Sequence, residues 1–401
     1  MDLATFEWLL TPDGRRLVAV AARVHAELGD DPVRAAEAVR REAPAASAPQ
    51  RAAALTQAGL RARAAAKLGA DAERMWFTPD GLEQATRARV AGHRAARTAA
   101  AAPAGVVDLG CGIGGDLVAL ARAGLTVAGV DLDPVRVAVA RANLAELGLP
   151  GAVEVADATT LDLSPFDVAF VDPARRGGAG RTFRPEEWAP SWTFVEGLLT
   201  SAGRPHAVVK AAPGIGHHLV PPGVEAEWVS ERGEVKEAVL WSPGLATCAR
   251  RATVIAAAGL ATLTEDDDPW RGGARPVRGV GEFLLEPDGA VVRAGLVTAV
   301  AAAVDGGLVD EHIAYVTADE AFHSPLARSY RVLEELPYRE KQLRAALRER
   351  GIGRLTVKKR GVDVVPEQLR RRLALRGDAE ATIVLTRVAG EGTALLVEPL
   401  A

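Results

Sequence analysis

The chain has 401 residues and a net charge of −4, so it is long enough for two or three domains and is not basic as a whole. Its two cysteines, Cys111 and Cys248, lack the spacing of metal ligands, which argues against a disulfide framework or a structural zinc site. Because no basic start precedes an apolar run and no long apolar stretch is free of charge, we expect no signal peptide, no membrane span and a cytoplasmic location.

Residues 1–74 place Ala, Arg, Glu and Leu at helical spacing, with breaks near Pro32 and at 44–49. This pattern predicts a few short helices that form an accessory bundle. Thr78-Pro79 then predicts the start of a helix that continues to residue 99, since Thr caps helices and Pro suits the first helical position.

From Val106 onward, short apolar runs alternate with glycine turns and helical segments, which predicts an open, mostly parallel α/β sheet over residues 75–262. We expect the last two predicted strands to pair as an antiparallel edge. The predicted strands are Val106–Leu109, Val127–Val130, Val153–Val155, Val168–Val171, Ala207–Lys210, Ala238–Trp241 and Ala252–Ala256.

Residues 263–278 combine acidic residues with Gly and Pro and predict a linker. A small α+β region follows over 279–401, with an apolar helix predicted at Val291–Val304.

The strongest motif is a glycine loop after the first strand, Asp108-Leu109-Gly110-Cys111-Gly112-Ile113-Gly114. Three glycines allow a tight turn and let a ligand approach the backbone closely. The letters also fit the glycine pattern of nicotinamide enzymes, which stay an alternative. A carboxylate at the end of the first strand, however, suits a cationic amino group and would repel a pyrophosphate.

Two further acids follow the next strands. Asp131 ends the second strand, where a carboxylate can accept both hydroxyls of a ribose, and Asp157 follows the third strand, where it can read an adenine amino group. Each acid alone could be a helix cap or a loop residue. Their order and spacing together favour a ligand site.

This series, a glycine loop followed by two strand-end acids, resembles the class I methyltransferases over roughly residues 75–256. The resemblance implies a Rossmann-like fold with S-adenosylmethionine bound along the carboxyl edge of the sheet. The cofactor-binding residues it implies are Asp108, Gly110, Cys111, Gly112, Gly114, Asp131, Leu132, Asp157 and Ala158.

The fourth strand ends in Asp172-Pro173, above the expected methyl group. Methyltransferases that act on exocyclic amines look similar here, and the carboxylate takes a hydrogen of the amine and so aims its lone pair. The chain departs from their pattern because Ala174 and Arg175 replace a proline and an aromatic residue. Since Arg stacks on bases and contacts phosphates, we predict Asp172, Pro173 and Arg175 as catalytic and Arg176 as substrate-binding.

The same segment also resembles the RNA uracil C5 methyltransferases, which use a cysteine nucleophile after a later strand. That place reads Ser242-Pro243 here, and we expect Cys248 to be a small core residue.

Met75-Trp76-Phe77-Thr78-Pro79 is similar to the lead-in of RNA cap guanine-N2 methyltransferases. The similarity implies that Trp76 binds substrate by stacking. The alternative is a core aromatic residue that holds the following helix.

The C-terminal section is basic, with fifteen Lys or Arg against six Asp or Glu between residues 324 and 376. About residues 324–401 resemble the THUMP-like domain found C-terminal to bacterial methyltransferases, and the whole chain resembles the THUMP-like class I methyltransferases. This likeness implies RNA binding, with Lys358, Lys359 and Arg360 as candidate substrate-binding residues.

We therefore expect an S-adenosylmethionine-dependent methyltransferase that acts on a base nitrogen of structured RNA, rRNA or tRNA, without a metal ion. Two alternatives remain at this point: a small-molecule methyltransferase, and a non-catalytic RNA-binding protein that retains the fold.

Overall fold

The computed structural model describes residues 1–29, 31–175, 188–270 and 276–400. These residues divide into two compact units, of which the first holds Met1–Ala211, Ile215–Val224 and Val239–Ala246 and the second holds the rest. The first unit includes residues 1–74, and within it the N-terminal helix α1 (Leu3–Leu9) packs on α8 (Pro134–Leu147).

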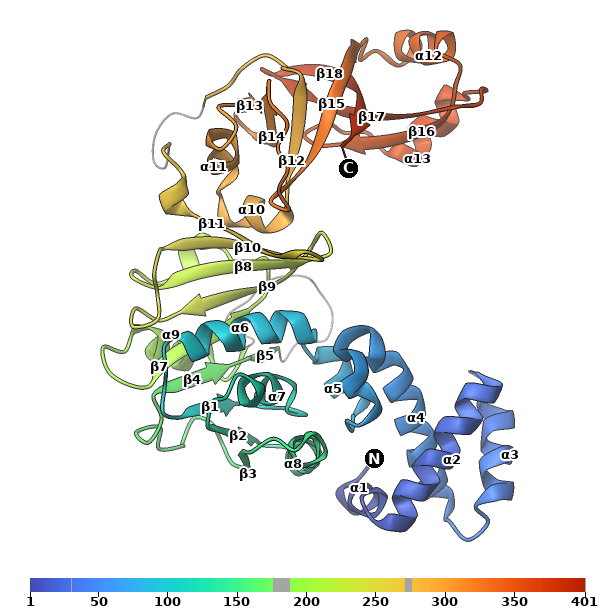
Figure 1. Cartoon of the computed structure of the whole chain (residues 1–401), viewed down its shortest axis with the longest axis vertical. Helices are drawn as coiled ribbons and strands as arrows, with labels where there is room; N and C mark the ends of the chain where they lie inside the picture. Colours follow the sequence, from blue (N-terminus) through green and yellow to red (C-terminus); the bar gives the residue numbers. More distant parts are fainter. Residues whose placement is uncertain (30, 176–187, 271–275, 401) are drawn as a thin grey trace. The chain divides into compact units, whose positions relative to one another are not determined.

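The N-terminal region of the first unit consists of four helices, in which α2 packs on α3 and α4 (Figure 1). Polar side chains cap the start of each of these four helices. At α2, for example, Thr11 accepts a hydrogen bond from the Gly14 amide, and the helix begins at Pro12. The elements are α1 (Leu3–Leu9), α2 (Pro12–Leu28), α3 (Pro32–Glu42), α4 (Ala48–Leu68) and the 3₁₀ turn η1 (Gly69–Glu73).

Two helices, α5 (Pro79–Gln84) and α6 (Ala88–Ala100), replace the single helix predicted after Thr78. The predicted cap is confirmed, because Thr78 Oγ1 accepts a hydrogen bond from the Gly81 amide at 3.1 Å. The interruption at 85–87 brings α6 onto α7, the helix that follows the glycine loop.

A parallel sheet in the order β7-β4-β1-β2-β3 forms the centre of the first unit (Figure 1). The chain runs outward from β1 through β2 and β3, then crosses to β4 and β7 on the other side, so the strand order reverses between β1 and β4. In such sheets ligands bind at the carboxyl ends of the strands beside this reversal. The strands are β1 (Val106–Leu109), β2 (Val127–Asp131), β3 (Ala152–Val155), β4 (Val168–Val171) and β7 (His206–Ala211).

Helices pack on this sheet, α7 on β2, α8 on β2 and β3, and α9 on β7. Gly114 begins α7 with a φ of +82°, and Asp133 caps α8 by accepting hydrogen bonds from Val135 and Arg136. The other elements of this part are α7 (Gly115–Arg122), α8 (Pro134–Leu147), β5 (Ala174–Arg175), β6 (Trp188–Ala189), α9 (Trp192–Thr200) and η3 (His217–Leu219).

The second unit begins with further strands, and β9 is divided between the units at Ala238. β10 lies parallel to β8 and antiparallel to β11, so the expected pairing of Ala238–Trp241 with Ala252–Ala256 is wrong. The reason is β8, whose alternating acidic residues hide a strand from an apolar pattern search. The bounds are β8 (Glu225–Glu231), β9 (Glu234–Trp241), β10 (Arg250–Ala256), β11 (Gly259–Thr264) and η4 (Glu265–Asp267).

A mixed sheet in the order β13-β14-β12-β15-β18-β17-β16 completes the second unit. The apolar helix expected at Val291–Val304 is two helices, because Gly295 turns the chain with a φ of +70°. The elements are β12 (Phe283–Pro287), α10 (Gly289–Ala294), α11 (Val297–Ala302), β13 (Gly307–Asp310), β14 (Ile313–Ala318), β15 (Ala327–Leu336), α12 (Glu340–Glu349), β16 (Ile352–Lys359), α13 (Pro366–Leu373), β17 (Ala379–Val388) and β18 (Glu391–Pro399).

Part of the expected linker is packed rather than extended. β11 ends at Thr264, and the buried Asp268 accepts a hydrogen bond from Thr298 Oγ1 at 2.5 Å; residues 271–275 of the linker lie outside the described part.

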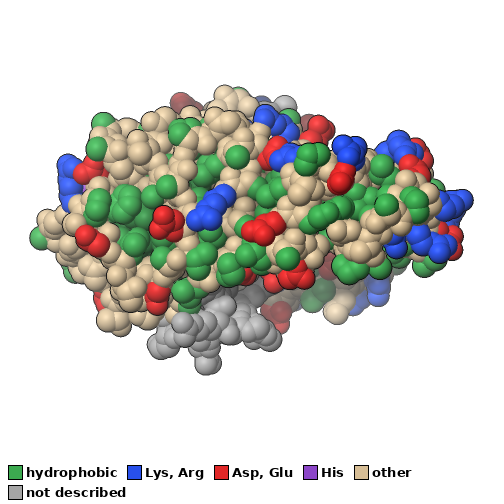
Figure 2. All heavy atoms as spheres, turned by 90° about the horizontal axis from the view of Figure 1, so that it is seen from below, with side chains coloured by type: hydrophobic (Ala, Val, Ile, Leu, Met, Phe, Trp, Pro, Cys, Tyr) green, Lys and Arg blue, Asp and Glu red, His purple; other side chains and the backbone are tan. Residues whose placement is uncertain are grey.

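None of the helices in the described ranges is both long and apolar enough to cross a membrane. On the face in Figure 2, many Lys and Arg side chains lie close to Asp or Glu side chains.

Candidate cofactor and acceptor site

The carboxyl ends of β1, β2 and β4 bring three acids, Asp108, Asp131 and Asp172, to one edge of the sheet. Asp108 lies within the last residues of β1, Asp131 ends β2, and Asp172 follows β4 directly. The charges of Asp131 and Asp172 both act on Asp108. The edge therefore gathers most of the acids that the sequence motif singled out.

The glycine loop turns from β1 into α7 with positive φ angles at Gly110, Gly112 and Gly114. At Gly114 a Cβ would also lie 3.1 Å from the Cβ of Ala140 on α8, so a larger residue would push the helix away. Gly129 on β2, which the sequence motif does not include, also lies where there is no room for a side chain. A Cβ there would lie 2.5 Å from Leu117 Cδ1 and 3.1 Å from Cys111 Sγ. The buried Cys111 side chain thus packs against the strand beneath the loop.

Asp108 is only 1 % exposed, and its Oδ1 atom has no hydrogen-bond partner among the described residues. Burial, together with the carboxylates of Asp116 and Asp172, raises the pKa of Asp108 well above its usual range. A buried carboxylate without a partner is costly, and a cationic ligand group would remove that cost. The site therefore fits an ammonium group such as the amino end of a methionine moiety.

Asp131 is held by the backbone on both of its oxygens. The Gly112 amide donates to Oδ2 at 3.0 Å and the Asp133 amide donates to Oδ1 at 2.9 Å. These bonds join the glycine loop to the start of α8 and fix the carboxylate, whose remaining lone pairs can accept the hydroxyls of a ribose.

Leu132, the next residue, is 70 % exposed at the same edge, and Val155 at the end of β3 is also exposed. Two exposed apolar side chains beside strand ends suit the faces of an adenine ring. Asp157 is exposed and accepts hydrogen bonds from the Thr159 amide and hydroxyl at 2.9 and 2.7 Å, which lower the pKa of Asp157. Ala158 lies within this turn, so an adenine contact by Asp157 would use its free oxygen.

Asp172 forms an ion pair with Lys210, whose Nζ lies 2.5 Å from Asp172 Oδ2. Lys210 belongs to β7, the strand next to β4, so the pair bridges neighbouring strand ends. Burial raises the pKa of Asp172, and the Lys210 ammonium partly offsets this effect. The structure thus pairs Lys210 with the predicted catalytic acid.

The other predicted acceptor residues are less defined. Pro173 follows Asp172 and is partly exposed, and Arg175 belongs to β5, although the structure does not describe its side chain. Arg176 lies outside the described residues.

Arg94 of α6 is a site residue that sequence reasoning missed, because it belongs to none of the motifs. Its side chain is 3 % exposed, forms an ion pair with Asp116 of α7 and lies with its guanidinium 4.7 Å from the centre of the Phe170 ring. Its charge lowers the pKa values of Asp108 and Asp172 and so counters the burial of both acids. The helical spacing of Arg94 from Val90 and Ala91, both buried, is the signal that could have revealed it.

Trp76 lies in the core rather than at the open edge, with 1 % exposure. Its ring meets Phe6 edge-on, with the ring centres 5.9 Å apart, and Arg61 lies 4.5 Å over its face. Asn143 of α8 accepts from the Trp76 amide at 2.6 Å and donates to the carbonyl oxygens of Trp76 and Ile113 at 3.1 and 2.8 Å. This packing favours the core alternative, in which the segment supports the glycine loop from behind.

In the C-terminal sheet, the three predicted substrate-binding residues have different surroundings. Lys358 pairs with Glu286, and this bond raises the pKa of Lys358 although burial opposes it. Arg360 donates to the Ala314 carbonyl oxygen at 2.7 Å, whereas Lys359 is exposed. Only Lys359 of the three is thus a free surface charge within the described residues.

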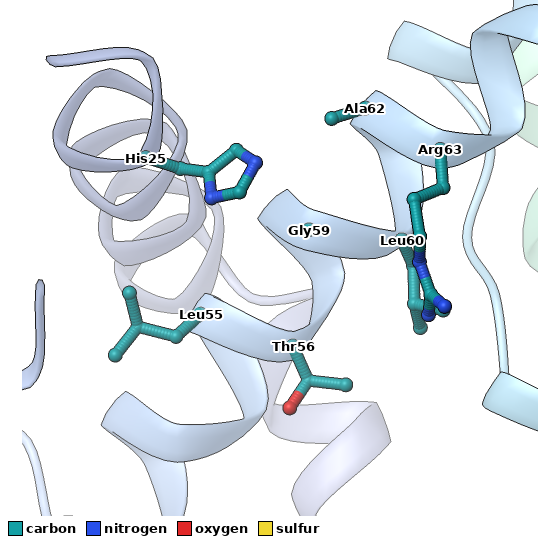
Figure 3. Close-up of a pocket in the computed structure, with 7 residues that line it drawn as sticks. All are labelled: His25, Leu55, Thr56, Gly59, Leu60, Ala62 and Arg63. Carbon is teal, nitrogen blue, oxygen red and sulfur yellow. The ribbon is translucent and has the colours of Figure 1, made fainter. Parts of the chain in front are cut away.

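Two other features of the described residues differ from this edge in their capacity to bind a ligand. No group of three or more His, Cys, Asp and Glu side chains in the described ranges is placed to hold a metal ion. A pocket of about 580 Å³ between α2 and α4 is lined by α4 residues and His25, which points across it from α2 (Figure 3). Its few polar groups do not converge on a common point, unlike the acids at the sheet edge.

Comparison with known proteins agrees with this geometry. Sequence profiles match a methyltransferase domain at residues 106–174, a THUMP domain-like region at 327–399 and a domain of unknown function, DUF8688, at 2–64. The fold resembles that of a protein from Porphyromonas gingivalis W83 assigned to the methyltransferases, with a TM-score of 0.73 over 96 % of this chain and 98 % of that one at 21 % identity.

The fold and the strand-end acids thus define a class I methyltransferase. Two uncharacterized S-adenosylmethionine-dependent methyltransferases of Mycobacterium tuberculosis, from strains CDC 1551 and H37Rv, are each 40 % identical to the chain over 342 residues, covering 82 % of it and 90 % of their own length. The chain belongs to this family, the THUMP-like class I S-adenosylmethionine-dependent methyltransferases, and S-adenosylmethionine is its cofactor.

Proposed function

We propose that this methyltransferase transfers the methyl group to a base nitrogen of structured RNA, rRNA or tRNA. The observation that carries the proposal is the Asp172–Lys210 pair at the carboxyl end of β4, beside Asp108. An ionised carboxylate there can accept a hydrogen bond from an exocyclic amine, whereas a carbon acceptor would need a nucleophile. The basic THUMP-like region supports a polynucleotide substrate.

On the donor side, Asp108 would pair with the cofactor's amino group and Asp131 with its ribose, while Leu132, Asp157 and Ala158 would border the adenine. The backbone of Gly110, Gly112 and Gly114 would approach the cofactor closely. The bound cofactor supplies a methyl group that is already activated on a sulfonium centre.

On the acceptor side, Asp172 would orient the amine and Pro173 would shape the opening beside it. Lys210 binds Asp172 Oδ2 and leaves Oδ1 for the acceptor. The acceptor nitrogen would lose a proton when it gains the methyl group that the bound cofactor supplies. The raised pKa of Asp172 makes its carboxylate a suitable acceptor for that proton. Arg175 and Arg176 would contact the base and its phosphates.

Transfer of radioactive methyl groups to RNA tests the proposal. The protein and labelled S-adenosylmethionine are incubated with total RNA from a bacterial strain that lacks the gene, and the RNA is digested to nucleosides. We expect label in an N-methylated nucleoside, and none with Asp172→Ala protein that still binds the cofactor. Label that is already present in small molecules before the digestion would instead indicate a small-molecule methyltransferase. Cofactor binding without any transfer would indicate a non-catalytic RNA-binding protein.

A further inference from the structure

The four-stranded part of the C-terminal sheet, β15-β18-β17-β16, has two different faces. Leu355 and Val357 of β16 and Ile383 of β17 belong to the apolar cluster that also contains buried residues of α12 and α13. Because side chains alternate along a strand, Thr356, Lys358 and Thr382 point to the opposite face. That face carries these polar side chains beside a second apolar cluster, which includes Tyr330, Val384 and Val397.

A pocket of about 660 Å³ lies on this opposite face and is separate from the methyl-transfer edge in sequence and in composition. It is within the size range of pockets that bind small molecules or single nucleotides. The lining residues that carry its chemistry are Ser324, Arg328, Tyr330, Thr356, Lys358 and Thr382. Hydroxyl groups and cations thus line one pocket, with Thr356 and Thr382 directly paired across β16 and β17.

Some charged groups of the pocket are paired within the protein, and others are available to a ligand. Glu286 accepts hydrogen bonds from both Lys358 and the Tyr330 hydroxyl, the latter at 3.0 Å, so the Lys358 charge is balanced and held in place. Arg328 is exposed on β15 and forms no ion pair within the described part of the chain. The hydroxyls of Thr356 and Thr382 likewise have no hydrogen-bond partner there. Arg328 and the hydroxyls of Thr356, Thr382 and Ser324 therefore remain as donors for a ligand, with the exposed His323 also lining the pocket.

We propose that this pocket binds the phosphate group of a nucleotide, and that the phosphate belongs to an RNA chain. The RNA source rests on the proposed function, whereas the phosphate chemistry comes from the pocket. A phosphate diester carries one negative charge, which Arg328 would balance, and its oxygens accept hydrogen bonds from hydroxyls. The site would anchor RNA through the C-terminal sheet face, not through the Lys358-Lys359-Arg360 run as a surface patch.

Binding of fluorescein-labelled octauridylate to the full-length protein, without S-adenosylmethionine, tests this proposal by fluorescence anisotropy at fixed salt. Arg328→Gln should weaken binding about 10-fold and reduce its salt dependence. The near-isosteric double variant Thr356→Val/Thr382→Val changes no charge and should weaken binding about 5-fold through its lost hydroxyls. Lys341→Gln is the matched control, because Lys341 is exposed on α12, which packs on the other face of the sheet; it should change affinity less than about 2-fold.

Competition with uridine 5′-monophosphate distinguishes the two sources of phosphate. Displacement only by unlabelled octauridylate supports an RNA chain, whereas equal displacement by the mononucleotide supports the phosphate site but overturns RNA as its source. If Arg328→Gln and the threonine double variant bind like the wild type, or if Lys341→Gln weakens binding as much as they do, the pocket is not the site. These outcomes involve no methyl transfer, so they are independent of a failure of the proposed function.

Discussion

The acids at the edge of the first sheet differ from the cations of the C-terminal sheet in whether the fold supplies them with partners. Asp108 is buried, and one of its oxygens has no partner in the described chain, so a ligand is needed to complete it. Of the three charges that the sequence offered to RNA, two are already bound, since Glu286 pairs with Lys358 and the Ala314 carbonyl oxygen accepts from Arg360. A charge in a sequence therefore becomes a binding group only where the fold leaves it unsatisfied.

We expect the largest effect on activity from substitutions of Asp172 and Lys210, on the acceptor side of the sheet edge. Asp172→Asn should lower methyl transfer about 1,000-fold, because the amide cannot accept the acceptor's proton, while cofactor affinity stays within about 2-fold. Lys210→Met should lower transfer less and make it more pH-dependent. Since Lys210 lowers the pKa of Asp172, its loss raises that pKa, and activity should fall more at pH 6.5 than at pH 8.5.

Single-turnover rates across pH, with cofactor affinity measured in parallel, check both variants. Lys210→Arg is the control, because it keeps the positive charge and should restore the pH profile. An unchanged profile in Lys210→Met would show that the ion pair has only a structural role.

Asn143 tests whether the segment around Trp76 supports the glycine loop or binds substrate. Asn143→Ala removes three hydrogen bonds and leaves buried backbone groups of Trp76 and Ile113 unpaired, which should lower the free energy of unfolding by about 3 kcal/mol. Asn143→Asp keeps the acceptor for the Trp76 amide and should lose less. Urea unfolding followed by tryptophan fluorescence measures both, and a stable Asn143→Ala protein with weaker RNA binding would favour the substrate role of Trp76.

The unsatisfied state of Asp108 predicts a pH effect on the cofactor-free protein. The pKa of Asp108 is raised in the folded state, so the folded state binds this proton more tightly than the unfolded chain. The stability that the proton provides is present at low pH and is lost as pH rises through the raised pKa. Asp108→Asn should remove this loss and melt at a higher temperature than the wild type at pH 8, by an amount equivalent to about 2 kcal/mol.

Asp157 is the matched contrast for that experiment. Its pKa is lowered by Thr159, so its contribution is present above the unfolded pKa and is lost as pH falls. Thermal melts of Asp157→Asn should therefore differ from the wild type in the opposite direction, and only slightly, because the group is exposed. If the melting temperatures of wild-type and Asp108→Asn protein changed equally with pH, the proposed effect of the Asp108 carboxylate on stability would be wrong.

The smallest expected effect separates the adjacent lysines of the C-terminal sheet. Lys358→Gln leaves Glu286 without its cation and should cost about 1 kcal/mol of stability, whereas Lys359→Gln should leave stability unchanged. Chemical unfolding of the two variants measures the difference. Equal stabilities would mean that the Lys358–Glu286 pair does not anchor the sheet.

Much of the fold was predictable from the sequence because local patterns determine it. The bounds of β1 and β4 agree with the predicted strands, and the Thr78 cap is where its side chain requires it. The predictions failed where tertiary partners decide. No sequence motif includes Arg94, and its burial depends on Asp116 and Phe170, which are distant in the sequence. β8 was missed because its glutamates, which are buried in the fold, look like surface residues in the sequence.

The candidate site shows the same division. The glycine loop and its acids follow from strand ends and spacing, so the position of Asp108 at the sheet edge could be predicted. The lack of a hydrogen-bond partner for Asp108 could not be predicted from the sequence. The pairing of Lys210 with Asp172 could not be predicted either, because β4 and β7 are neighbours only through the strand order of the sheet.

The most direct test of the central claim is a calorimetric titration of wild-type and Asp108→Asn protein with S-adenosylhomocysteine and with 5′-methylthioadenosine, which lacks the amino-acid portion. If Asp108 binds the amino group, the wild type should prefer S-adenosylhomocysteine by at least about 100-fold, and Asp108→Asn should lose most of that preference while it binds methylthioadenosine as before. If Asp108→Asn keeps the full preference, the unpartnered oxygen of Asp108 is not the cofactor's binding group.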